Sequence, residues 1–199
     1  MQRNFLCFCA FCGIPLPAEA SRFALFMVFK TTELLITIDP QTTILQFADF
    51  DKGLELRPQV AVTYNARASA YARKGEYNRA LVDYNRAIQL SPQLKMLYYN
   101  RGLAFARKDG YDLALADFNK AIELNPQEAE VYNARGCVYS YKGDYDRAIT
   151  DYSEAIRLKP DFWITYKNRA RLYEIIGNTA KAQEDRNKSF ELQKQTPKP

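Results

Sequence analysis

Four prolines at equal intervals constrain the fold of this chain more than any other feature of its sequence. They stand 34 residues apart, at Pro58, Pro92, Pro126 and Pro160. A fixed period of this length indicates a repeat array, in which every repeat is one small supersecondary unit. The period divides most of the chain into the windows 61–94, 95–128, 129–162 and 163–196.

Each window has the pattern of two amphipathic helices, with apolar residues at helical spacing. In the first window, one face of the first helix carries Tyr64, Ala68 and Tyr71. One face of the second helix carries Leu81, Tyr84 and Ile88. Gly75 separates the helices because glycine readily takes the left-handed conformation that ends a helix. Pro92 ends the second helix, since the residue before proline avoids the helical region. One hairpin cannot bury both apolar faces alone, so we expect consecutive hairpins to stack.

These columns resemble the tetratricopeptide repeat. The first helices begin with segments such as Tyr132-Asn133-Ala134-Arg135-Gly136, similar to a variant found in many bacterial members of that family. The second helices carry the family's succession of alanine, aromatic residue, alanine and proline. The resemblance covers 61–196 and implies an all-α fold, an α-solenoid of stacked antiparallel helix hairpins. It also implies a non-enzymatic scaffold that binds other proteins.

Parts of the chain depart from the repeat pattern. The segment 42–58 parallels a second helix and predicts a half repeat, whereas 21–41 matches the repeat poorly. The turn at Asp109-Gly110 lacks glycine at its first position, but aspartate tolerates the left-handed conformation better than most residues. In the last window, polar residues replace the packing columns, which predicts a capping helix with a soluble outer face. These residues are Thr179, Gln183, Arg186 and Ser189.

Arginine and aspartate recur 16 residues apart, one on each helix of every hairpin. The pairs are Arg67–Asp83, Arg101–Asp117, Arg135–Asp151 and Arg169–Asp185. We predict that each pair forms a bidentate salt bridge that fixes the register of its hairpin. The same spacing in all four windows indicates a structural role rather than a catalytic one.

Residues 1–20 have the features of an export signal peptide. A short basic region precedes the apolar residues 5–16 and a small-residue boundary at Ala18-Glu19-Ala20. This pattern predicts an exported protein, periplasmic or secreted. The alternative is a cytoplasmic protein with a misassigned start. Three cysteines in the apolar run lack a fourth ligand, so we do not assign them to a metal site. They are Cys7, Cys9 and Cys12.

Stacked hairpins curve, and in such arrays the first helices line a concave groove. We predict that residues off the packing face, basic ones among them, bind an extended and acidic peptide or a partner helix there. These residues are Asn65, Ser69, Arg73, Tyr99, Asn100, Arg107, Asn133, Tyr141, Lys167, Asn168 and Arg171. An asparagine amide donates and accepts hydrogen bonds at once, which suits a peptide backbone. The alternative is that they are solvated polar residues of a generic repeat.

The binding residues of one subclass of the family can be compared with the residues at the same positions of this chain. Chaperone-binding members clamp a C-terminal carboxylate with lysine, asparagine and arginine, and only Asn100 matches that pattern. The remaining clamp positions hold Asn65, Ser69, Glu130 and Ala134, where the pattern requires Lys, Asn, Lys and Arg. We therefore do not expect a chaperone tail as the ligand.

Composition narrows the function further. The chain has no histidine, which removes Ser-His-Asp triads, Cys-His dyads and histidine metal sites. We expect no enzyme, no cofactor and no metal. The net charge is +5, but acidic and basic residues interleave in every repeat, so we expect no nucleic-acid binding. We expect a protein or peptide partner, without stable membrane insertion beyond the N-terminal signal. The alternative is a self-assembling structural element that dimerises through 42–58.

Overall fold

The computed structural model describes residues 40–195, which form α-helices without any β-strand. The helices are α1 (Pro40–Leu56), α2 (Ala61–Arg73), α3 (Tyr77–Leu90), α4 (Lys95–Arg107), α5 (Tyr111–Leu124), α6 (Ala129–Tyr141), α7 (Tyr145–Leu158), α8 (Trp163–Ile175) and α9 (Thr179–Gln195). The predicted signal peptide at 1–20 and the segment 21–39 lie outside the described residues.

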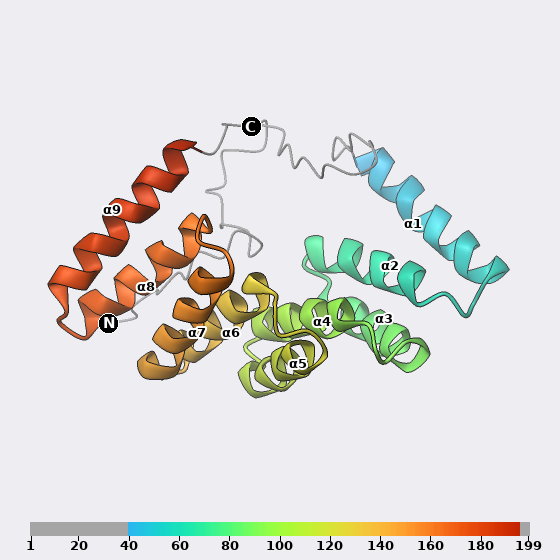
Figure 1. Ribbon diagram of the computed structural model, residues 1–199. Helices are drawn as coiled ribbons and strands as arrows, with labels where there is room; N and C mark the ends of the chain where they lie inside the picture. The colour runs from blue at the N-terminus through green and yellow to red at the C-terminus, as the bar shows by residue number, and fades with distance from the viewer. Residues whose placement is uncertain (1–39, 196–199) are drawn as a thin grey trace.

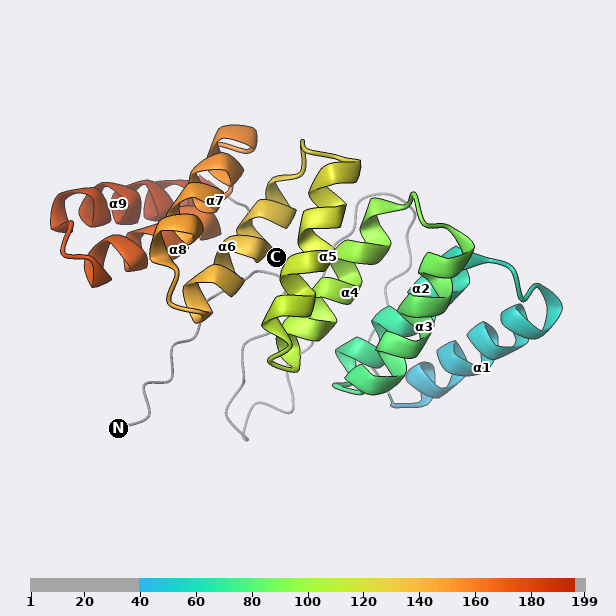
Figure 2. The ribbon, with the colours of Figure 1, turned by 90° about the horizontal axis from the view of Figure 1, so that it is seen from below.

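The helices form an arc of antiparallel hairpins (Figure 1). The inner side of the arc consists of α2, α4, α6 and α8, and the outer side of α3, α5, α7 and α9. Among the described helices, each inner helix contacts the next inner helix, whereas successive outer helices do not touch one another. This difference gives the array its curvature. Figure 2 shows the hairpins side by side, with α1 at one end and α9 at the other. The prediction of an all-α solenoid is confirmed.

The turns inside the hairpins follow from single residues in the left-handed conformation. Gly75, Gly143 and Gly177 have φ of 78°, 79° and 79°. The turn without glycine at this place uses Asp109, with φ of 58°, as the sequence predicted. In each turn a backbone N–H closes the helix end, for example Gly110 N to Phe105 O at 2.9 Å. All four hairpins therefore share one turn geometry.

Two glycines allow the helices of a hairpin to approach closely. A Cβ atom added at Gly102 would lie 2.8 Å from the ring of Phe118, and one at Gly136 would lie 2.8 Å from the ring of Tyr152. Both rings are completely buried, so they have no free space into which to move. Glycine at these positions is thus a requirement of packing.

The two end helices of the array differ from the helices between them. At one end, α1 packs against α2, and the ring of Phe47 lies 4.6 Å from that of Tyr71. At the other end, the polar residues predicted for the outer face of α9 are exposed, with one exception. Ser189 is buried, and it occupies the same position of the window as the buried Ala121 and Ala155. The assignment of Ser189 to the outer face was wrong.

Each predicted arginine–aspartate pair is present and bidentate. Arg101 Nε lies 2.8 Å from Asp117 Oδ2, and Nη2 lies 2.7 Å from Oδ1. The same atoms meet at 2.7–2.8 Å in the other three hairpins. All four aspartates are 4% exposed. The hydrogen bond to Asp117 raises the pKa of Arg101, so the guanidinium stays charged. The prediction of a bidentate salt bridge in each hairpin is confirmed.

The arginines also bind the preceding repeat, a contact that sequence analysis missed. Arg101 Nη1 donates to Asn85 Oδ1 of α3 at 2.6 Å, while Tyr98 and Phe105 flank the guanidinium at 5.8 Å. Equivalent bonds join Arg67 to Asp51, Arg135 to Asn119 and Arg169 to Ser153. The sequence does indicate this contact, because a polar residue stands 16 positions before each of the four arginines and recurs every 34 residues.

Asp117→Ala should lower the free energy of unfolding by about 3–5 kcal/mol, because it leaves the partly buried Arg101 without its counter-ion. The matched variant Asn85→Ala removes only the exposed third acceptor and should cost about 1 kcal/mol. Urea unfolding followed by circular dichroism measures both. Equal losses for the two variants would contradict the dominant role of the buried bidentate pair.

Candidate functional site

The residues predicted to bind a peptide lie on the inner helices α2, α4, α6 and α8, but not all of them are accessible. The exposed ones are Arg73, Arg107, Tyr141 and Lys167. The half-buried ones are Ser69, Tyr99, Asn100 and Arg171. The buried ones are Asn65, Asn133 and Asn168.

The asparagines join neighbouring inner helices. Asn100 Nδ2 donates to Asn65 Oδ1 at 3.0 Å, between α4 and α2. Asn168 Nδ2 donates to Asn133 Oδ1 at 3.2 Å, between α8 and α6, and Thr165 Oγ1 donates to the same oxygen at 3.2 Å. Asn133 is 0% exposed, so its amide is not accessible to a ligand in this structure. The amides expected to meet a peptide backbone instead hold repeats together.

This pairing arises because the asparagines alternate between two adjacent positions of the window. Asn65 and Asn133 stand one position earlier than Asn100 and Asn168, so the members of each pair are 35 residues apart. The extra residue beyond the period places the second amide opposite the first. At the middle junction, between α4 and α6, the order is reversed and the contact is apolar. There Tyr99 packs against the buried cluster that contains Ala134.

Ser69 is engaged with the outer helix of its own hairpin. Its Oγ lies 3.1 Å from the hydroxyl of Tyr84, whose pKa is raised by burial. In the third window, Cys137 Sγ takes the same place and accepts from the hydroxyl of Tyr152 at 3.5 Å. Ser69 thus satisfies a buried tyrosine, as Cys137 does.

Two rows of exposed side chains remain on the inner surface of the first two repeats. The basic row consists of Arg73 and Arg107, the last residues of α2 and α4. The apolar row consists of Val62 and Met96, near the starts of the same helices, which are 60% and 46% exposed. Each helix rises about 1.5 Å per residue, so about 16 Å separate the two rows. We call this area the two-row surface.

Acidic residues on the inner helices α6 and α8 are already paired. Lys159 Nζ donates to Glu130 Oε1 at 2.8 Å, and Arg186 forms an ion pair with Glu174. Burial acts to raise the pKa of Glu130, but the hydrogen bond and the charge of Lys159, together with a backbone hydrogen bond, outweigh it, and the pKa lies below its ordinary value.

The described residues hold neither a metal-binding group nor a membrane span. No cluster of three or more Cys, Asp or Glu side chains within 40–195 could hold a metal ion. None of the helices there combines the length and the apolar character needed to cross a membrane.

The geometry defines a class of protein, an α-solenoid whose hairpins share one inner surface, and comparisons with known proteins name the family. The family model described as Tetratricopeptide repeat matches residues 96–128 and 129–162, and the model described as TPR repeat matches 68–109. The chain is a tetratricopeptide repeat protein. No curated protein sequence matches it.

Solved structures with the same architecture include those of MamA. One MamA crystal structure is 27% identical, covering 80% of this chain and 98% of that one, with a TM-score of 0.69. MamA from Desulfovibrio magneticus RS-1 is 18% identical, covering 80% and 90%, with a TM-score of 0.72. The first TPR of Spaghetti (RPAP3), bound to an HSP90 peptide, is 23% identical, covering 60% and 94%, with a TM-score of 0.58. Together, the family and these neighbours support a protein-interaction scaffold.

Asn133→Ala should lower the free energy of unfolding by about 1–3 kcal/mol, because Thr165 and Asn168 would lose a buried acceptor. Asn187→Ala, the same change at an exposed site of α9, should alter it by less than about 0.5 kcal/mol. Chemical denaturation of both variants provides the measurement. Indistinguishable stabilities would show that the buried amide contact does not hold α6 and α8 together.

Proposed function

We propose that this protein is a non-enzymatic scaffold that binds an extended acidic segment of a partner protein on the two-row surface. The observation that carries the proposal is the exposure of Arg73 and Arg107 at equivalent ends of adjacent inner helices, opposite Val62 and Met96. Basic side chains attract carboxylates and steer their approach. The exposed apolar row offers contact area that water otherwise covers.

The spacing of the arginines sets the expected pattern of the ligand. Adjacent packed helices lie about 8–10 Å apart, which places Arg73 and Arg107 at about that separation. An extended chain in the polyproline II conformation advances about 3.1 Å per residue and returns to the same face every three residues, so carboxylates about three residues apart match the two arginines. Half-buried Tyr99 and Asn100 lie between the rows.

The test is a selection of random dodecapeptides displayed on phage against the purified chain. Selected peptides should be acidic, with carboxylates about three residues apart and one apolar residue. Arg73→Glu combined with Arg107→Glu should weaken their binding by at least about tenfold, which corresponds to about 1.4 kcal/mol. The control combines Arg86→Glu with Arg157→Glu, the same charge reversal at exposed sites of the outer helices α3 and α7. Peptides that are not acidic, or equal binding by both double variants, would refute the proposal.

A second candidate function, self-association through the half repeat 42–58, has one specific observation in its favour. Among the described helices α1 contacts only α2, and Leu56 at its end is 75% exposed. Sedimentation velocity over a range of protein concentrations measures the assembly state. The mass should rise with concentration and fall back to that of a monomer in Leu56→Glu. A constant monomer mass would exclude this candidate and leave the peptide proposal untouched.

A further inference from the structure

Lysines in the turns of successive hairpins link each repeat to the one before it. Lys108, which follows α4, donates through Nζ to Asn78 in the first turn of α3. Lys142, which follows α6, forms an ion pair with Asp112 in the first turn of α5. In both cases the acceptor lies 30 residues before the lysine. Two consecutive junctions therefore place a lysine ammonium group at the same point of the repeat.

The row of lysines ends at the last junction, between α7 and α8. Asp146, in the first turn of α7, holds the position of Asn78 and Asp112. The residue 30 positions later is Ile176 instead of a lysine, and it is 48% exposed. Asp146 is exposed as well. The acceptor of the repeating contact is thus present, while the chain supplies no cation from the equivalent position.

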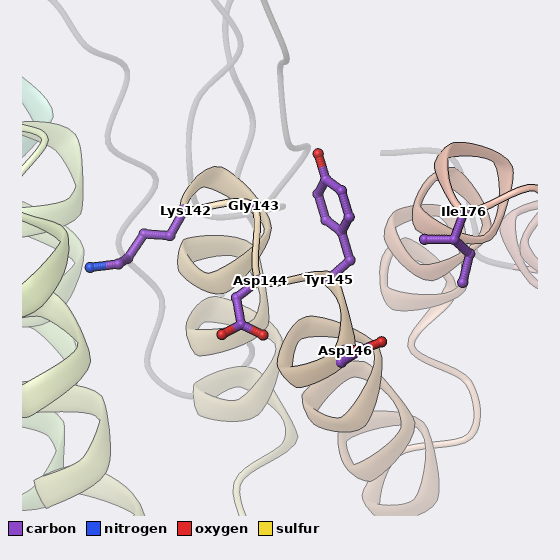
Figure 3. A pocket seen from close by; sticks show the side chains of 6 residues that line it. All are labelled: Lys142, Gly143, Asp144, Tyr145, Asp146 and Ile176. Carbon is purple, nitrogen blue, oxygen red and sulfur yellow. The ribbon is translucent and has the colours of Figure 1, made fainter.

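A hollow of about 500 Å³ lies at this place. We call it the end hollow, and its lining residues are Lys142, Gly143, Asp144, Tyr145, Asp146 and Ile176. Figure 3 shows Lys142 pointing away from the other lining side chains, and Ile176 facing the hollow from the opposite side. Asp144 already accepts from Arg147 Nε at 2.5 Å. Asp146 is therefore the lining carboxylate that remains for a cation from outside.

We propose that the end hollow binds a lysine or arginine side chain of a partner protein. The array itself shows the chemistry of the occupant, because lysine fills the equivalent place at the two preceding junctions. The aliphatic stem of such a side chain would lie along Ile176 and Tyr145, and its charged head would meet the carboxylate of Asp146. Long basic side chains bury their stems on apolar surface in this way while the head stays solvated. The end hollow is separate from the two-row surface. It would bind a basic side chain, whereas the two-row surface would bind acidic ones.

The test is a titration of the full chain, followed by ¹⁵N–¹H nuclear magnetic resonance, with N-acetyl-lysine methylamide and N-acetyl-arginine methylamide. Both should shift the backbone amides of 144–146 and 176–177 saturably. Half-saturation on the order of 10 mM is expected for one exposed ion pair with a short apolar contact. N-acetyl-norleucine methylamide, which has the stem without the charge, should not saturate these shifts. Equal shifts with the norleucine compound, or no saturable shift with either cation, would overturn the proposal.

Three substitutions, one of them a control, locate the binding site. Asp146→Asn should weaken binding of the lysine compound at least about fivefold, because it removes the charge that an exposed ion pair needs. Ile176→Lys restores the lysine of the preceding junctions, so the chain should fill its own hollow and lose the response. Ile176→Leu keeps the apolar wall and should respond as the native chain does. Unchanged binding by Ile176→Lys would overturn the proposal, even where Asp146→Asn weakens it.

Discussion

A buried aspartate on each outer helix, held by an arginine on the inner helix, is the contact on which the rest of the array depends. A carboxylate taken out of water must be paired, so the distance and register of the two helices are fixed wherever the pair forms. The third nitrogen of the same guanidinium bonds to the preceding outer helix, as in Arg101 with Asn85. One side chain therefore sets both the hairpin and its junction. The close approach of Gly102 to Phe118 requires the same spacing.

The repeats share the arginine–aspartate pairs but differ in the side chains of their inner helices. These differences decide which side chains are exposed to a partner. Amide pairs join α2 to α4, through Asn65 and Asn100, and α6 to α8, through Asn133 and Asn168. The middle junction is apolar around Tyr99. These amide pairs hold neighbouring inner helices together. A repeat protein of this kind can vary its surface as long as the arginine–aspartate frame is kept.

Much of the fold could be predicted from residue order alone. The 34-residue period and the turn residues predicted a pair of helices in each window. Asp109 adopts the left-handed conformation that glycines adopt in the other turns. These features depend on hydrogen bonds and dihedral angles within a few residues. The candidate site was less predictable. The inner helices were identified correctly, yet Asn133 is buried and Ser69 bonds to Tyr84, because both contacts come from helices distant in sequence.

The sequence by itself determined that this chain forms stacked hairpins and which arginine meets which aspartate, since a spacing of 16 residues places both on facing sides of one hairpin. Only the tertiary structure decided which polar residues of the inner helices are consumed between repeats. Spacing along a helix gives the direction of a side chain relative to its own axis. The tilt between one inner helix and the next decides whether that direction leads to a neighbour or to solvent. That tilt is the sum of all contacts at a junction, so no single repeat contains it.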